Sequence, residues 1–456
     1  MNRIAKRSFT VTLLALLLLG GFVFFLVEYA MNAPQWAVAD SSPHVYDDDR
    51  FQSGTVYDRD GNILLQMQDR WTYSSDPQIR KATLHWIGDR EGNIQVPAVP
   101  NYYDQVLGFD YLNGIYTYGG IGSGEGSVQL TVSAQLQSLA LEQMNGRKGT
   151  IAVYNYKTGQ ILCAVTTPTF DPDDLPDIAA DPVTYEGAYM NRFVQSAYTP
   201  GSIFKVVTLA AALEELPNAA ELTFTCTGSW GGGEYPVTCE SVHGTQSLKQ
   251  AFCNSCNCAF AELSGILGSD VLHTYVEKFG ITDPVSFDGI TTAKGNFEKT
   301  ENPVSLAWSS IGQYTDLVNP CAYVLFMGAI AGDGSGAMPY VVAKADDGQE
   351  GYMAQTAFSS PVISSQTAQT VQEYMRYNVT AKYGADHFPG LTVCAKTGTA
   401  EKDDGVAPTA MFTGFVMDAQ YPLAFIVCVE EGGYGASTCI PIASRVLTAC
   451  KQYMDS

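Results

Sequence analysis

The stretch AYTPGSIFKVVTLAAALEE, residues 197–215, joins a helix-forming run to a pair of reactive side chains. Pro200-Gly201 opens the predicted helix, and Ser202 and Lys205 follow three residues apart on neighbouring turns of one face. The start of a helix offers unpaired N–H groups and a positive dipole end, which suit an oxyanion. Apolar neighbours would lower the pKa of Lys205 and make it a base, whereas a capping serine beside a solvated lysine is the alternative.

The tripeptide Lys-Thr-Gly occurs twice, and the two copies predict different structures. At Lys157 it lies between two strand-like runs, where the glycine serves a tight turn and the lysine faces water. At Lys396 it continues to Thr399 within the strand-like run TVCAKTGTA. There Gly398 would let a ligand backbone approach the strand edge, so only the second copy predicts a binding strand.

A third short motif lies between these two, in the stretch FCNSCNCAF, where Ser255 and Asn257 stand among three cysteines. The motifs Ser202-x-x-Lys205, Ser255-x-Asn257 and Lys396-Thr397-Gly398 occur in the order and approximate spacing of the penicillin-binding protein and serine β-lactamase superfamily. Each motif is weak alone, but the three in register make a strong resemblance.

The resemblance extends from about residue 53 to the C-terminus and points to the class B penicillin-binding proteins. SGTVYDRDGNIL is similar to their N-terminal signature, YKTGQILCAVTTPTFDPD to the entry of their transpeptidase domain, and NRFVQSAYTPGSIFK to their nucleophile segment. Tyr314 departs from the glycine that often follows Gly-Gln in this family. The implied fold is α/β, an antiparallel sheet flanked by helices with an all-helical subdomain.

The same resemblance implies a peptidoglycan D,D-transpeptidase that β-lactams acylate. Ser202 would attack the bond between the last two D-alanines of a stem peptide, with Lys205 as proton acceptor. Ser255 would relay a proton to the leaving amine, and Asn257 would bind the substrate amide and Lys205. Substrate binding would fall to Lys396, Thr397, Gly398 and Thr399: Lys396 and the two threonine hydroxyls would bind the terminal carboxylate, and the N–H groups of Ser202 and Thr399 would form the oxyanion hole.

Residues 9–27, within a predicted anchor of residues 9–29, form an apolar run that can cross a hydrocarbon layer of about 30 Å as a helix. Basic residues precede it and acidic residues follow it, which predicts a cytoplasmic tail (1–8) and a single-pass anchor with the catalytic domain outside the cell. A cleaved signal peptide is the alternative, although its small-residue site would lie far beyond the apolar run. Beyond the anchor we predict a β-rich membrane-proximal module (40–127) and a transpeptidase domain (128–456).

Local patterns predict several elements within these two parts. Asp60-Gly61-Asn62 is typical of a hairpin turn. Residues 247–267 are predicted to be helical. The strand-like runs TVCAKTGTA, MFTGFVMD and LAFIVCVEE precede a predicted helix over residues 440–454.

The composition and organisation narrow the functions further. The net charge of -22 would repel a phosphate backbone, so nucleic acid is not an expected partner. The resemblance implies stem peptides, β-lactams and a membrane-embedded glycan polymerase as partners. A D,D-carboxypeptidase or β-lactamase-like hydrolase, a β-lactam sensor and a non-catalytic scaffold are the alternatives; no Glu-x-x-Leu-Asn segment supports a lactamase, and the intact motifs disfavour a scaffold.

All eleven cysteines follow residue 162, in the part expected to be exported, and an odd number leaves at least one unpaired. Three interpretations are open. Free, buried thiols need no cofactor. A disulfide between Cys239 and Cys256 would influence Ser255. Finally, Cys226, Cys239, His243 and Cys256 have the residue types of a structural Cys3His zinc site, while Cys253 and Cys258 are expected only to pack.

Overall fold

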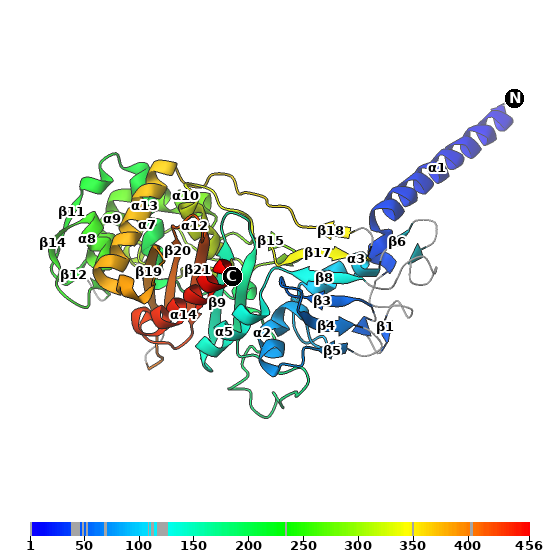
Figure 1. The fold of residues 1–456 in the computed structure, drawn as a ribbon. Coiled ribbons are helices and arrows are strands. Elements are labelled where there is room, and N and C mark those ends of the chain that lie inside the picture. The colour runs from blue at the N-terminus through cyan, green and yellow to red at the C-terminus, as the bar shows by residue number, and fades with distance from the viewer. Residues whose placement is uncertain are drawn as a thin grey trace.

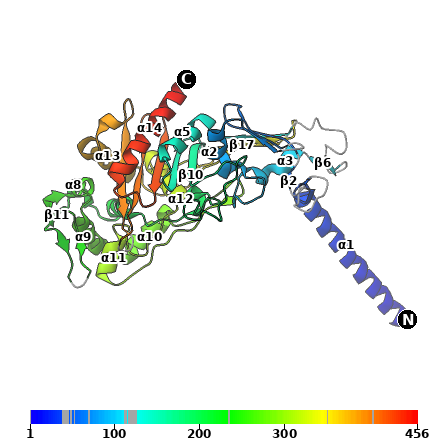
Figure 2. The ribbon, with the colours of Figure 1, turned by 90° about the horizontal axis from the view of Figure 1, so that it is seen from below.

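The protein is described here from a computed structural model, in which an N-terminal helix projects from a two-part body (Figures 1 and 2). The described residues are 2–37, 46–47, 50–51, 53–67, 71–107, 109–110, 114–115, 126–232, 235–348, 351–401 and 405–456.

Helix α1 (Asn2–Ala37) is longer than the predicted anchor and takes in the segment predicted to be a tail. Its Arg3–Ala33 segment has the length and apolar composition of a membrane span, and its apolar side chains are exposed. Residues 3–7 continue the helix because lysine, arginine and alanine favour helix formation and nothing before residue 9 interrupts it. This single apolar helix is consistent with a single-pass membrane anchor.

The larger part of the body is built on a five-stranded antiparallel sheet in the order β10-β9-β21-β20-β19. Its strands are β9 (Gly149–Asn155), β10 (Ile161–Thr167), β19 (Val393–Ala400), β20 (Thr409–Val416) and β21 (Leu423–Val429). The hairpin predicted around Lys157 and the three C-terminal strands are therefore confirmed. Strand β19 is an edge strand, which leaves one side of it open to other segments.

Helices cover both faces of this sheet. In β21, Leu423, Phe425 and Val427 pack on one face, while Ala424, Ile426 and Cys428 pack on the other, because side chains alternate along a strand. Because both faces of the sheet are buried, its strands are nearly continuous apolar runs in the sequence. One face carries α5 (Ala134–Met144) and α14 (Gly435–Asp455), and the other carries α12 (Pro320–Ala331) and α13 (Ser365–Asn378) (Figure 1).

A helical subdomain lies beside the β19 edge (Figure 1). It consists of η2 (Gly201–Phe204), α7 (Lys205–Glu215), α8 (Leu248–Cys253), α9 (Asn257–Leu267), α10 (Ser269–Phe279) and α11 (Pro303–Ser309). Two small hairpins adjoin α9, formed by β11 (Thr223–Cys226) with β14 (Gly244–Ser247) and β12 (Ser229–Trp230) with β13 (Val237–Thr238). We call residues 222–247 the cysteine lobe.

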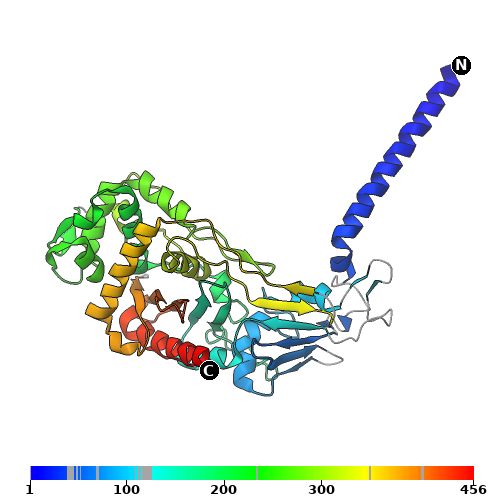
Figure 3. The same ribbon diagram turned by 45° about the horizontal axis from the view of Figure 1, so that its top comes forward.

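The smaller part of the body is a six-stranded sheet in the order β18-β17-β8-β3-β4-β5 (Figure 3). It contains β3 (Thr55–Tyr57), β4 (Ile63–Met67), β5 (Trp71–Tyr73), β8 (Ser127–Leu130), β17 (Val342–Asp346) and β18 (Gly351–Met353). The turn predicted at residues 60–62 joins β3 to β4. The predicted module of residues 40–127 is not continuous in sequence, because β17 and β18 return from the middle of the chain to pair with β8.

The other helical elements are short or lie between the two parts: α2 (Pro77–Ile87), η1 (Val99–Tyr102), α3 (Tyr103–Leu107), α6 (Arg192–Gln195), η3 (Ala219–Glu221), η4 (Val379–Tyr383) and η5 (Ala385–His387). The remaining strands form two-residue pairs: β1 (Tyr46–Asp47), β2 (Arg50–Phe51), β6 (Phe109–Asp110), β7 (Gly114–Ile115), β15 (Ser286–Phe287) and β16 (Ile290–Thr291).

Candidate active site

Ser202 lies in a 3-10 turn rather than in the first turn of an α-helix, since η2 precedes α7 and the α-helix begins at Lys205. Gly201 enters this turn with a φ of 55°, and its N–H donates to the Gly312 carbonyl at 2.8 Å. A Cβ on Gly201 would stand 2.4 Å from the Thr399 carbonyl oxygen. Glycine is therefore required here both by conformation and by the close approach of β19.

Lys205 joins the first two motifs. Its Nζ lies 2.8 Å from Ser202 Oγ, 2.6 Å from Asn257 Oδ1 and 3.2 Å from both the carbonyl oxygen and Oγ of Ser255. The side chain is 0% exposed, and this burial lowers the pKa of Lys205 to about 7. A substantial share of the amine is thus neutral near pH 7 and able to accept a proton.

The second motif occupies a break between two helices that the sequence had predicted as one continuous helical stretch. Helix α8 ends at Cys253, α9 begins at Asn257, and Ser255 between them has a φ of 54°. Asn257 Nδ2 donates to the Thr238 carbonyl at 2.7 Å, which ties α9 to the cysteine lobe. The break turns both Ser255 and Asn257 towards Lys205.

Lys396 extends from the edge strand into the same network. Its Nζ donates to Ser255 Oγ at 3.1 Å and to the Thr397 carbonyl at 2.9 Å. Burial lowers the pKa of Lys396 well below its ordinary value, and the positive charge of Lys205 acts in the same direction. Lys396 is 0% exposed, so in this structure the ammonium lies beneath Ser255 instead of facing the cleft directly.

The backbone of β19 presents Thr399 to the cleft. Thr397 N–H donates to the Tyr383 hydroxyl at 3.2 Å, and therefore points away from β20. The Thr399 carbonyl oxygen lies beside Gly201, on the side of β19 away from β20. Residues 397 and 399 therefore direct their backbone groups to the same side, because these directions alternate from one strand residue to the next. The N–H of Thr399 thus points to the same open side of the edge strand. Tyr383 was missed in the sequence, where nothing distinguished it from the other tyrosines.

Gly398 is needed for a reason other than the one inferred from the sequence. A Cβ at this position would lie 2.8 Å from the Pro200 carbonyl oxygen and 2.9 Å from Ile203 Cγ2. The backbone that approaches this glycine most closely is therefore the chain's own nucleophile turn.

The three motifs line one cleft of about 810 Å³. Ser202, Ser255, Asn257 and residues 397–399 all contribute to its wall. Residues that the sequence did not single out also line the cleft, among them Lys382, Trp308, Glu240 and Tyr434. Tyr314, which departs from the family pattern, is exposed and has a φ of 70°. The Lys157 copy of the tripeptide lies in an exposed turn between β9 and β10.

Comparison with known proteins agrees with this geometry. Residues 149–448 match the family model of the penicillin binding protein transpeptidase domain. The chain belongs to this transpeptidase family. The peptidoglycan D,D-transpeptidase PbpA of Mycolicibacterium smegmatis is 30% identical over 362 residues, which cover 71% of this chain and 72% of that protein.

Two further relatives illustrate the range of this transpeptidase family. Stage V sporulation protein D of Bacillus subtilis is 29% identical over 345 residues, covering 70% of this chain and 52% of that protein. Among solved structures, a ceftriaxone acyl-enzyme complex of penicillin-binding protein A from M. tuberculosis superimposes with a TM-score of 0.76 at 23% identity, covering 88% of this chain and 98% of that one. The fold predicted from the sequence is confirmed.

The cysteine lobe borders the cleft, and three of its residues lie with Cys256, at the start of α9, in a group that could hold a metal. One ligand atom from each of Cys226, Cys239, His243 and Cys256 lies within 4.8 Å of the other three. Cys258, expected only to pack, also approaches this group, with its Sγ 3.5 Å from Cys239 Sγ. No disulfide links any of the eleven cysteines.

Proposed function

We propose that this peptidoglycan D,D-transpeptidase cross-links stem peptides through an acyl-enzyme on Ser202 and is acylated by β-lactams at the same residue. The observation that carries the proposal is the convergence of Ser202, Ser255 and Asn257 on the buried amine of Lys205. A neutral lysine in hydrogen-bonding contact with a serine is a base positioned to activate that serine.

In the acylation step, Ser202 Oγ attacks the carbonyl carbon between the two terminal D-alanines and its proton passes to Lys205 Nζ, 2.8 Å away. The N–H groups of Ser202 and Thr399 stabilise the oxyanion, which is worth about 3 kcal/mol per donor in comparable sites. The carbon–nitrogen bond then breaks. Ser255, whose Oγ lies 3.2 Å from Lys205 Nζ, passes a proton from the lysine to the departing D-alanine amine.

The terminal carboxylate of the donor peptide binds at the β19 end of the cleft. The hydroxyls of Thr397 and Thr399 line that end, and Lys396 lies beneath them. An arriving carboxylate favours the protonated form of Lys396, so the ammonium contributes its charge when substrate is bound. The amine of a second stem peptide then attacks the acyl-enzyme carbonyl and gives its proton to Lys205. The ester bond to Ser202 Oγ breaks as the cross-link forms, and Lys205 Nζ returns the proton to Ser202 Oγ, 2.8 Å away.

The apolar helix α1 supports a position at the membrane. With basic residues before the apolar segment and acidic residues after it, the catalytic part lies outside the cell, where the stem peptides are. A membrane-embedded glycan polymerase is the partner that supplies new strands to such an enzyme. The net charge of -22 leaves nucleic acid without electrostatic support as a partner.

The test is covalent labelling of the full-length protein in detergent with penicillin, measured by intact mass. We expect one adduct per chain, located on Ser202 by peptide mapping and absent from Ser202→Ala. Ser365→Ala, which removes an exposed hydroxyl at the start of α13, should label normally. A folded protein that acquires no mass with several β-lactams would disprove the proposal.

Turnover separates a cross-linking enzyme from a hydrolase. The protein would be given a D-Ala-D-Ala pentapeptide together with an excess of a D-amino acid acceptor. A transpeptidase forms the exchanged peptide, whereas a D,D-carboxypeptidase releases the hydrolysed tetrapeptide at the same rate with or without the acceptor.

A further inference from the structure

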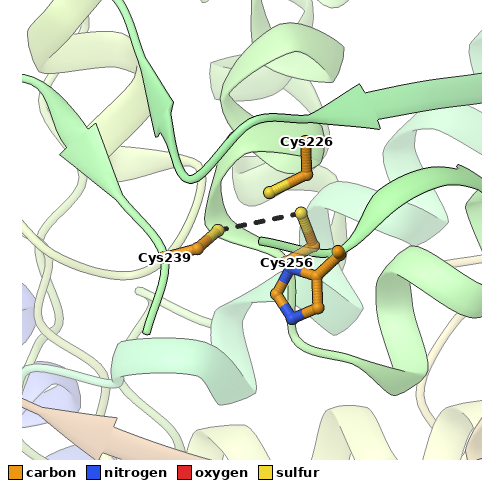
Figure 4. Close-up of side chains that lie close together, drawn as sticks. Cys226, Cys239 and Cys256 are labelled. Carbon is orange, nitrogen blue, oxygen red and sulfur yellow. Dashed lines mark hydrogen bonds between the residues drawn. The ribbon is translucent and has the colours of Figure 1, made fainter. Parts of the chain in front are cut away.

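The cysteine lobe and the start of α9 together place three thiols and an imidazole around one point. Cys226 ends β11, Cys239 follows β13, His243 precedes β14, and Cys256 caps the N-terminus of α9. Figure 4 shows the three labelled thiols pointing towards one another. Four ligand atoms from four separate segments therefore meet.

The distances match a tetrahedral metal site. Cys239 Sγ and Cys256 Sγ are 3.8 Å apart. Two thiolates bound to zinc at about 2.3 Å in tetrahedral geometry are separated by about 3.8 Å, whereas a disulfide requires about 2.05 Å. All four ligand atoms lie within 4.8 Å of one another, close enough for one cation to bind them together.

His243 provides an independent sign of a ligand. Its Nδ1 is buried and has no hydrogen-bond partner among the described residues, while Nε2 lies 3.4 Å from Ser241 Oγ. A buried polar atom without a partner is costly. A metal on Nδ1 would remove this cost and leave the Nε2 proton to Ser241, the arrangement in which the second nitrogen of a metal-bound histidine is usually found.

The backbone around the cluster favours thiolates. Ala259 N–H donates to Cys256 Sγ and Cys258 N–H donates to Cys239 Sγ, both at 3.4 Å. A disulfide between Cys239 and either neighbour would leave Nδ1 of His243 unsatisfied, so it accounts for less of the cluster than a metal does.

We propose that Cys226, Cys239, His243 and Cys256 bind one zinc ion, and that this ion holds the second catalytic motif in position. Three thiolates and one imidazole at tetrahedral spacing suit zinc among the divalent cations. The proposed ligands Cys239 and Cys256 are adjacent in sequence to residues that form or hold the second motif. Cys256 lies between Ser255 and Asn257, and Cys239 follows Thr238, whose carbonyl accepts from Asn257.

The backbone conformation of Ser255 is the feature that such positioning would stabilise. Its φ of 54° is unfavourable for a residue with a side chain, and such conformations persist only where the surroundings enforce them. A metal bond at the next residue would supply this restraint. The four ligands act as positioning residues, since none of them touches the reacting atoms.

The first experiment measures metal in the full-length protein, purified through a tag without histidines and dialysed against zinc-containing and then metal-free buffer. Elemental analysis should find one zinc per chain, and Co²⁺ in its place should give the absorption of a tetrahedral thiolate complex. Cys226→Ser and His243→Ala should lose the zinc. Cys258→Ser, which removes a thiol 3.5 Å from Cys239 but outside the ligand set, should keep it.

Three results would overturn the site. They are folded wild-type protein without metal, a mass two hydrogens lower that maps to a disulfide at Cys239, and loss of zinc from Cys258→Ser equal to that from Cys226→Ser. None of these results depends on whether the protein is a transpeptidase, because metal content is measured without substrate.

The second experiment tests the link to the cleft. Removing zinc from the wild type with a strong chelator should slow penicillin acylation by a factor of about 10 to 100, because small displacements of catalytic groups have effects of this size. Adding zinc back should restore the rate, and folding should be followed by far-ultraviolet circular dichroism. An unchanged acylation rate in zinc-free, folded protein would disprove the positioning role. A folded protein that is not acylated even with zinc bound would instead contradict the proposed function.

Discussion

The catalytic cleft and the cysteine lobe border each other at Thr238 and Asn257, yet very different amounts of core support them. The cleft is built on strands whose residues are buried on both faces and on α7, whose side chains from Lys205 to Ala212 are all buried. Among the described residues of the lobe, the buried apolar side chains are Phe224, Cys226 and Val237. Packing can hold the cleft together, whereas the lobe needs bonds to specific side chains.

This difference determines which changes each region tolerates. In the cleft, a buried amine is held by several hydrogen bonds at once, so chemistry should fail before the fold does. In the lobe, the proposed metal ligands would hold the backbone in place, so removing one of them should loosen the backbone locally.

The largest effect is expected from removing the base. Lys205→Ala should slow penicillin acylation by about 100 to 10,000-fold, the usual contribution of a general base, with little loss of the fold. Lys278→Ala is the matched control, because Lys278 is an exposed lysine of the same subdomain that pairs with Glu214. Stopped-flow measurement of acylation decides the matter, and a Lys205→Ala protein acylated at the wild-type rate would remove the lysine from the mechanism.

The sequence showed the motifs but not how deeply their side chains are buried. Ser202, Lys205, Ser255, Asn257 and residues 396–399 were found because each motif is local, and strands β9, β10 and β19 to β21 were found because apolar runs bounded by turns are local too. The burial of Lys396 could not be found, since it depends on Ser255 and on the Phe252 ring, whose centroid lies 6.0 Å from Nζ. These partners are more than a hundred residues away in the chain.

The same limit explains the fold features that were missed. Strand β17 pairs with β8 across about two hundred residues, and short strands carry too little pattern to predict such a pairing. The break at Ser255 was missed because the predicted helix of residues 247–267 has apolar residues at helical spacing on both sides of it. The cysteine and histidine set was predicted from residue types alone, and only the folded chain brings the four ligand atoms together.

The next largest effect is expected from pH. Burial places the pKa of Lys205 at about 7, and the neutral amine is the active form, so acylation should speed up as pH rises through 7 and level off above it. At pH 5, two units below the pKa, about 1% of the amine is neutral and the rate should be about a hundredfold below its plateau. A rate that is flat between pH 5 and 9 would contradict Lys205 as the proton acceptor.

A smaller effect tests the packing of the nucleophile turn against β19. Gly201→Ala would force a left-handed φ of 55° on alanine and bring a methyl group 2.4 Å from the Thr399 carbonyl. We expect a loss of about 1–3 kcal/mol in the free energy of unfolding and slower acylation. Gly265→Ala is the control: Gly265 is exposed within α9, an added Cβ meets nothing within 4 Å, and the change should stabilise by about 0.5–1 kcal/mol. Thermal unfolding of both variants gives the comparison.

The smallest effect on the whole molecule, and the sharpest contrast between the two regions, should appear in amide hydrogen exchange after zinc removal. Strands β11 and β14 should exchange faster without the metal, because their side chains bury little apolar surface and the proposed ion would join Cys226 to α9. Strands β20 and β21 should keep their protection, since helices cover both of their faces. Equal protection of the lobe with and without zinc would mean that packing alone holds it. Faster exchange in β20 and β21 as well would mean that the two regions unfold as one unit, and that the cleft depends on the lobe for more than the placement of Ser255 and Asn257.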